Sequence, residues 1–328
     1  PSGSRRSQGF EGETMKLRSS ISGLALAVGL GVMVAGCGQV NQVRAQKAFK
    51  DANKLYAASD WRAAAAKYEE AIQLNPENAY SHFFLANCLD NMYRPTRAGE
   101  PDNDALLSKA IDNYKLAGEK IEDPLWKRRS LEFLVSAYGP DKLNDPTMAE
   151  PIVKQMIELD PADPANYFQL AQIYENSGEY ELAEQTFMKA KDAKPSDPAV
   201  YMQLAGYFNR QGDFPRTIEA LNQRISIEPN NPEAHYTVST YYWDKAYRDF
   251  RLKDAEKLDM VVKGLESVDK AITIKDDYME AIAYKNLLLR LQANLIKDPA
   301  RQQALIREAD QLRDKAEEMR KAKNAAAS

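Results

Sequence analysis

The chain has 328 residues, with 44 lysines and arginines against 48 aspartates and glutamates and a formal net charge of −4 at pH 7. This balance argues against nucleic acid as a partner, because binding to phosphates calls for a basic surface. Only two cysteines occur, so no disulfide framework holds the fold together.

The beginning of the chain predicts export. Residues 1–14 precede the first methionine, and we interpret them as an upstream extension outside the fold. From Met15 a short basic region leads into an uncharged apolar stretch over residues 21–34, and small residues and Cys37 follow. This order is typical of a secretory signal. A membrane-spanning helix is the alternative, but the stretch is shorter than the roughly 20 apolar residues that a span requires.

The tetrad Val34-Ala35-Gly36-Cys37 resembles the lipobox of bacterial lipoproteins. The resemblance implies that the Cys37 thiol is lipidated and that residues 15–36 are then removed as a signal peptide. A diacylglycerol and an amide-linked acyl chain supply more than the two anchoring signals that stable attachment requires. Residue 38 is glycine instead of the aspartate that often retains such proteins at the inner membrane, so the resemblance favours the outer membrane. We therefore expect residues 37–328 to fold as a lipid-anchored protein of the bacterial cell envelope.

Residues 37–328 are predicted to be helical and repetitive. Strand signals are scarce, and helix-length apolar patterns recur between Asp-Pro and Asn-Pro pairs. A small residue, a ring four positions later, a second small residue and a proline recur, most clearly as Ala64, Tyr68, Ala71, Pro76 and as Ala183, Phe187, Ala190, Pro195. In the first helices of two successive units a second pattern repeats at an offset of 34 residues, as Tyr167, Leu170, Ala171, Tyr174 and as Tyr201, Leu204, Ala205, Phe208.

This pattern resembles the tetratricopeptide repeat, almost residue for residue over residues 164–231. Small residues let two antiparallel helices approach closely, rings fill the space between successive pairs, glycine turns the chain, and proline ends the second helix. The resemblance predicts an all-α solenoid of about seven helix-turn-helix repeats. They begin near Ala45, Ala79, Leu125, Pro164, Pro198, Pro232 and Met279.

Several segments depart from the repeat. Residues 91–104 are rich in proline, glycine and charge and predict a protruding loop, whereas residues 244–263 have apolar residues spaced for extended helices. Arg224 stands where the repeat has a small residue. The charged segment 304–323 predicts a capping helix, because a terminal repeat has one face without a neighbour.

Residues that could carry chemistry are scarce. His82 and His235 both fall near core positions of first helices, and we interpret both as structural. Cys88 lies in an apolar segment and predicts a buried thiol. No His, Cys and acidic residues have the spacing of metal ligands, so we expect no metal site, no cofactor and no catalytic residues.

The predicted binding surface is the concave face, where inward residues of first helices alternate rings with amides. Side-chain amides can bond both groups of an extended peptide backbone, while rings accept apolar side chains. The alternative is that these rings only cover gaps between repeats. The candidate groove residues are Phe49, Asn53, Tyr56, Tyr80, Phe83, Asn87, Phe168, Gln172, Met202, Tyr236 and Trp243.

The predicted function is a membrane-anchored scaffold that recruits protein partners into a cell-envelope assembly. Lipoproteins with tetratricopeptide repeats, which this chain resembles, help to assemble outer-membrane barrels, pilus secretin rings and exopolysaccharide export systems. One alternative is a stable subunit of a membrane complex that docks through its two insertions. Another is a polysaccharide-binding lipoprotein, in which Tyr80, Tyr236 and Trp243 stack on sugar rings. An enzyme is not expected.

Overall fold

The computed structural model describes residues 32–326, with side chains from residue 39 to residue 325. The predicted extension, most of the predicted signal segment and the Cys37 side chain lie outside this description. Within residues 32–326 the chain forms fourteen α-helices and one short 3-10 helix, and no strand.

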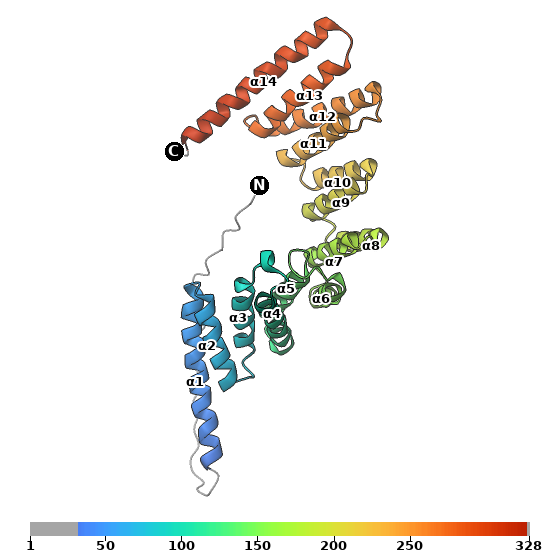
Figure 1. Cartoon of the computed structure of the whole chain (residues 1–328). Coiled ribbons are helices and arrows are strands. Elements are labelled where there is room, and N and C mark those ends of the chain that lie inside the picture. Colours follow the sequence, from blue (N-terminus) through green and yellow to red (C-terminus); the bar gives the residue numbers. More distant parts are fainter. Residues whose placement is uncertain (1–31, 327–328) are drawn as a thin grey trace.

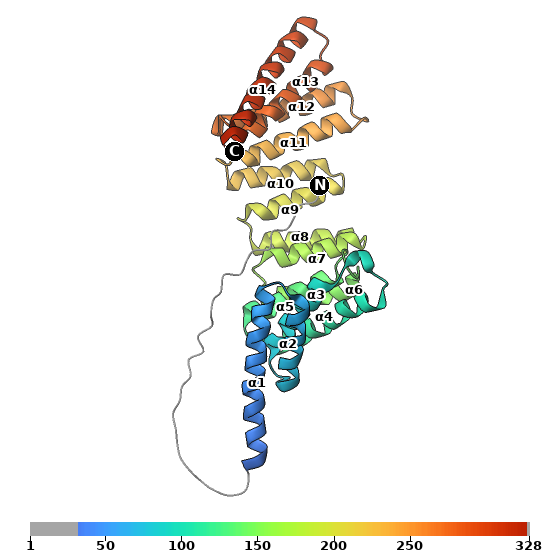
Figure 2. The same cartoon turned by 60° about the vertical axis from the view of Figure 1, so that its left-hand side comes forward.

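The helices pair as seven consecutive hairpins, which stack in chain order from α1 at one end to α14 at the other (Figures 1 and 2). The pairs are α1 (Val32–Ala57) with α2 (Trp61–Leu74), α3 (Ala79–Met92) with α4 (Pro101–Lys120), α5 (Pro124–Tyr138) with α6 (Pro146–Leu159), α7 (Pro164–Asn176) with α8 (Tyr180–Ala193), α9 (Pro198–Arg210) with α10 (Phe214–Ile227), α11 (Pro232–Arg248) with α12 (Asp254–Ile274), and α13 (Met279–Leu295) with α14 (Pro299–Ala326). The predicted all-α solenoid of about seven repeats is confirmed.

The same local signals start the first helices of three successive hairpins. Asp163, Asp197 and Asn231 each precede a proline, and their side chains accept the backbone N–H of the second helical residue at 3.0, 2.9 and 2.9 Å. These bonds satisfy N–H groups that the first turn leaves unpaired, and proline is tolerated at that point because it has no N–H to satisfy.

Small residues and rings pack as the repeat pattern predicts. Ala171 and Ala205 have no exposed surface. Rings of successive hairpins meet between them, with the centroids of Phe187 and Tyr207 5.0 Å apart. The turn after α7 contains Gly178 at a φ of 78°, a left-handed conformation that glycine adopts without steric cost.

The first insertion is more ordered than the protruding loop that the sequence predicts. A 3-10 helix, η1 (Pro95–Arg97), follows α3, and residues 101–104 already belong to α4. The buried Asn103 side chain accepts the Arg94 N–H at 2.9 Å and donates to the Arg94 and Arg97 carbonyls at 3.1 and 3.0 Å. One amide therefore ties the insertion to the start of α4.

Two further departures from the repeat lie in the last two hairpins. Residues 244–263 form the end of α11, the turn at 249–253 and the start of α12. The charged segment 304–323 lies within α14, which is the second helix of the seventh hairpin and not an additional element. Figure 1 shows α14 covering the open end of the stack.

Candidate functional site

Two of the predicted groove residues are not available to a ligand. Phe83 and Asn87 have exposed fractions of 3% and 6%. The side-chain oxygen of Asn87 accepts a hydrogen bond from the Tyr56 hydroxyl at 2.8 Å, and the side-chain N–H of Asn87 donates to the Tyr114 hydroxyl at 3.2 Å. Burial raises the pKa of Tyr56 to about 12, so its hydroxyl remains a donor. The prediction that Asn87 bonds a partner is corrected, because its amide joins the first two hairpins.

Most of the remaining predicted rings pack on other rings. In the first three hairpins the ring centroids of Phe49 and Tyr68 lie 5.7 Å apart, those of Tyr56 and Phe84 5.3 Å, and those of Tyr80 and Trp126 5.8 Å. In the last two hairpins the ring centroids of Tyr236 and Tyr284 lie 5.5 Å apart, and Trp243 stacks on Tyr247 with the centroids 4.7 Å apart. The contacts of Tyr56, Tyr80 and Tyr236 join different repeats and favour the alternative interpretation, in which the rings cover the gaps between repeats.

The last four predicted groove residues differ in what surrounds them. The ring centroids of Phe168 and Phe187 lie 6.2 Å apart, and the Met202 sulfur is 2.9 Å from the Arg224 guanidinium. Asn53 accepts a hydrogen bond from the Tyr68 hydroxyl at 2.7 Å. Gln172 is exposed and bonds only within its own helix, to Asn176 at 2.9 Å and to Glu175 at 3.4 Å.

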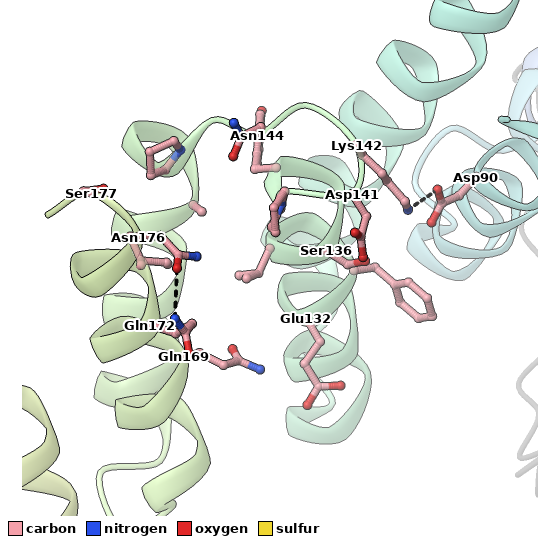
Figure 3. Close-up of a pocket in the computed structure, with 18 of the residues that line it drawn as sticks. Asp90, Glu132, Ser136, Asp141, Lys142, Asn144, Gln169, Gln172, Asn176 and Ser177 are labelled. Carbon is pink, nitrogen blue, oxygen red and sulfur yellow. Dashed lines mark hydrogen bonds and ion pairs between the residues drawn. The ribbon is translucent and has the colours of Figure 1, made fainter. Parts of the chain in front are cut away.

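Gln172 lies in a cleft of about 910 Å³, which we call the α5–α7 cleft. The end of α3, the second half of α5, the loop at 139–145, the start of α6 and the second half of α7 line it. Figure 3 shows Gln169, Gln172 and Asn176 of α7 on one side, with Glu132 and Ser136 of α5 facing them. The structure thus joins one predicted groove residue to a site that the sequence did not indicate.

The cleft lies where two clusters of the hydrophobic core meet. Buried residues form one cluster through the first three hairpins and another that runs from α6 to α11, and Val135 and Ile173 pack against both. Both side chains line the cleft and are half-buried. They provide an apolar floor between the two clusters.

The wall opposite α7 is held in place by the loop at 139–145. Asn144 adopts a left-handed φ of 50°, and its N–H bonds the Gly139 carbonyl at 2.9 Å. The Lys142 ammonium forms an ion pair with Asp90 of α3, and only 17% and 9% of these side chains are exposed. Backbone bonds and the ion pair therefore fix the shape of the wall.

The polar groups of the cleft are suited to binding an extended backbone. Five side-chain amides line it, those of Asn91, Asn144, Gln169, Gln172 and Asn176. Each amide offers both donors and an acceptor, the combination that an extended backbone requires. No group of three or more His, Cys, Asp or Glu within residues 32–326 is placed to hold a metal ion.

The histidines and the buried cysteine have structural roles. His235 Nε2 lies 2.9 Å from the Pro229 carbonyl oxygen, and the Tyr201 hydroxyl donates to the Pro195 carbonyl at 2.8 Å, one repeat earlier. His82 contacts the Pro76 carbonyl at 3.2 Å in the same way. Cys88 is fully buried, which raises its pKa to about 12.

Arg224 is a buried cation that the sequence marked only as an exception to the repeat. Its exposed fraction is 7%, and its guanidinium forms ion pairs with Glu228 and, at 3.4 Å, with Glu233 of α11. Arg224 therefore replaces the small residue of the repeat because it makes a charged contact between successive hairpins.

Two models of the tetratricopeptide repeat match the chain, over residues 49–114 and residues 142–205. Both matched stretches of the chain are tetratricopeptide repeats. Tetratricopeptide repeat solenoids generally serve as scaffolds for protein–protein interaction, so the fold implies protein partners. The second match begins at Lys142 and includes all of α7, so it covers one wall of the α5–α7 cleft, whereas α5 lies outside it.

Solved tetratricopeptide repeat structures resemble the chain at low sequence identity. The C-terminal part of such a protein from Cytophaga hutchinsonii is 14% identical, with a TM-score of 0.55 over 83% of this chain and 98% of that chain. A protein from Parabacteroides merdae is 13% identical, with a TM-score of 0.45 over 81% and 98%. YrrB, described as having an unusual peptide-binding site, is 18% identical, with a TM-score of 0.42 over 62% and 96%. The first likeness supports the solenoid fold.

Two other comparisons bear on the chain. No curated protein matched it. Of the helices described within residues 32–326, none combines the length and the apolar character needed to cross a membrane.

Proposed function

We propose that the chain is a membrane-anchored scaffold that holds an extended segment of a protein partner in the α5–α7 cleft, within a bacterial cell-envelope assembly. The observation that carries this proposal is the cleft itself, in which five side-chain amides surround an apolar floor. An extended segment can bond its backbone to the amides and place apolar side chains on Val135 and Ile173.

The form of α1 supports anchoring through Cys37. The helix is continuous over Val32–Ala57, but the residues from Gln39 to Arg44 are exposed and the first buried residue is Ala45. At a rise of 1.5 Å per residue, Cys37 would stand about 12 Å before the packed part of the solenoid. That length of helix would act as a short spacer between a lipid anchor and the repeats, and Gly38 favours the outer membrane.

The alternative of a stable subunit is favoured by one observation at the α11–α12 turn. Phe250 in this turn has an exposed fraction of 89% and Tyr247 at the end of α11 one of 62%, so this region presents two rings to solvent. A docking arm would use such rings in a contact with another subunit. Polysaccharide stacking gains no comparable support, because Trp243 stacks on Tyr247 and Tyr236 packs on Tyr278.

Site-specific photocross-linking in native membranes tests the proposal. A photoreactive residue placed at Gln172 or Asn144 should capture one partner, because both side chains line the cleft. The same residue at Gln185, exposed on the outer side of α8, is the matched control. Capture of a partner from Phe250 with none from the cleft positions would instead establish docking through the α11–α12 turn.

A further inference from the structure

We infer that the segment held in the α5–α7 cleft is basic, with lysine or arginine side chains that reach Glu132 and Asp141. The inference rests on the proposed function, since it names the chemistry of the partner that the same cleft would hold. It depends on the charges around the cleft, on the helix ends that meet there and on the placement of the apolar floor.

The ionisable groups of the cleft are mostly acidic. Asp90, Glu132 and Asp141 supply three carboxylates, and Lys142 supplies the one ammonium among the lining residues. The Lys142 ammonium already forms an ion pair with Asp90. Glu132 forms an ion pair with Arg128 at 3.3 Å, and Arg128 also reaches Asp163 at 3.4 Å. The lining therefore offers no uncommitted cation to a partner carboxylate.

Helix ends add to the negative potential. α3 ends at Met92, α5 at Tyr138 and α7 at Asn176, and the last turn of each helix lines the cleft. The carbonyl end of an α-helix carries a partial negative charge of roughly half an electron. The one helix that begins there, α6, has its positive end opposed by Asp145, which accepts the Met148 N–H at 3.2 Å.

The apolar and acidic groups are placed for an alternating sequence. Successive side chains of an extended segment point to opposite sides. One side would rest on Val135 and Ile173, while the other would point away from them, toward the half-buried Glu132 and the exposed Asp141 that also line the cleft. Residues that alternate between small apolar and basic types would satisfy both sides at once.

A binding assay with synthetic peptides tests the charge preference. The probes are three short fluorescent peptides in which alanine alternates with lysine, with glutamine or with glutamate. The full chain in non-ionic detergent should bind the lysine peptide at least about tenfold more tightly than the glutamine peptide at low salt, and the glutamate peptide most weakly. Raised salt should reduce this preference, because exposed charges are screened.

Two charge variants locate the preference. Glu132→Gln with Asp141→Asn should abolish it, whereas Glu181→Gln with Asp192→Asn, an equal charge change on the exposed side of α8, should leave it intact. Melting curves verify that both variants are folded. Equal binding of the lysine and glutamine peptides, a preference for glutamate, or a lysine preference that survives in the cleft variant would overturn the inference. If Gln172 still captures a partner in that case, the proposed function stands and only its charge preference fails.

Discussion

Lys142 in the loop after α5 forms an ion pair with Asp90 near the end of α3, 52 residues earlier in the chain (Figure 3). The exposed fractions of the two side chains are 17% and 9%, so little water replaces this contact if it is lost. The pair joins the second hairpin to the third and fixes one wall of the α5–α7 cleft.

Lys142→Ala should destabilise the protein by about 1–3 kcal/mol, because Asp90 would keep a nearly buried charge without its partner. The free energy of unfolding in urea measures the change. Lys67→Ala removes an ammonium from an exposed pair with Glu70 and should have no measurable effect. Equal stability of the two variants would show that the Lys142 pair contributes nothing.

Asn87→Ala should destabilise the fold, whereas Gln172→Ala should not. Loss of the Asn87 amide leaves the Tyr56 and Tyr114 hydroxyls without that partner, at a cost of about 1–3 kcal/mol. Gln172 is exposed and bonds only neighbours in its helix. Thermal melts of both variants check the difference, and cross-linking then reports whether Gln172→Ala weakens partner capture. Similar melting temperatures would contradict the structural role of Asn87.

Ala171→Leu and Ala205→Leu should each destabilise by about 1–3 kcal/mol, because both alanines are fully buried and added methyl groups would overpack the contact. Ala165→Leu and Ala199→Leu make the same change at exposed positions of the same helices, α7 and α9. Chemical denaturation compares the two sets. If the buried substitutions cost no more than the exposed ones, the packing at these alanines is misassigned.

Cys88 should resist alkylation in the folded protein at pH 8 and react once the chain is unfolded. The thiolate is the reactive species, and burial raises the pKa of Cys88 to about 12. Its pKa in the unfolded chain is about 8.5. From about pH 8.5 to about pH 12 the unfolded state therefore releases a proton that the folded state keeps, so this thiol should lower stability as the pH rises. Mass spectrometry after timed labelling measures how strongly the fold protects the Cys88 thiol. Rapid labelling of the native chain would contradict this prediction.

Cys37→Ser should yield an uncleaved precursor or a product released from the membrane, if the thiol carries the proposed anchor. Membrane fractionation separates these outcomes from wild type, and intact mass reports the modification directly. Cys88→Ser is the matched control, because it removes the other cysteine and should leave the chain attached. An unmodified Cys37 in membrane-bound wild-type protein would rule out lipid anchoring at this residue.

The sequence by itself determined the helical repeat. The offset of 34 residues between Tyr167 and Tyr201, the alanines at 171 and 205, and the capping residues before each proline concern contacts within a hairpin or between neighbouring ones. Such contacts recur at constant spacing, so they can be found in one chain without coordinates.

The tertiary structure alone decided which inward residues remain open. Asn87 and Gln172 have the same chemistry, yet Asn87 is buried between Tyr56 of the first hairpin and Tyr114 of the second, while Gln172 faces the cleft. The cleft itself depends on the loop at 139–145 and on the pairing of Lys142 with Asp90. These contacts arise where the chain departs from its repeat, and their partners have no fixed spacing along the sequence, so only the packing of the hairpins brings them together.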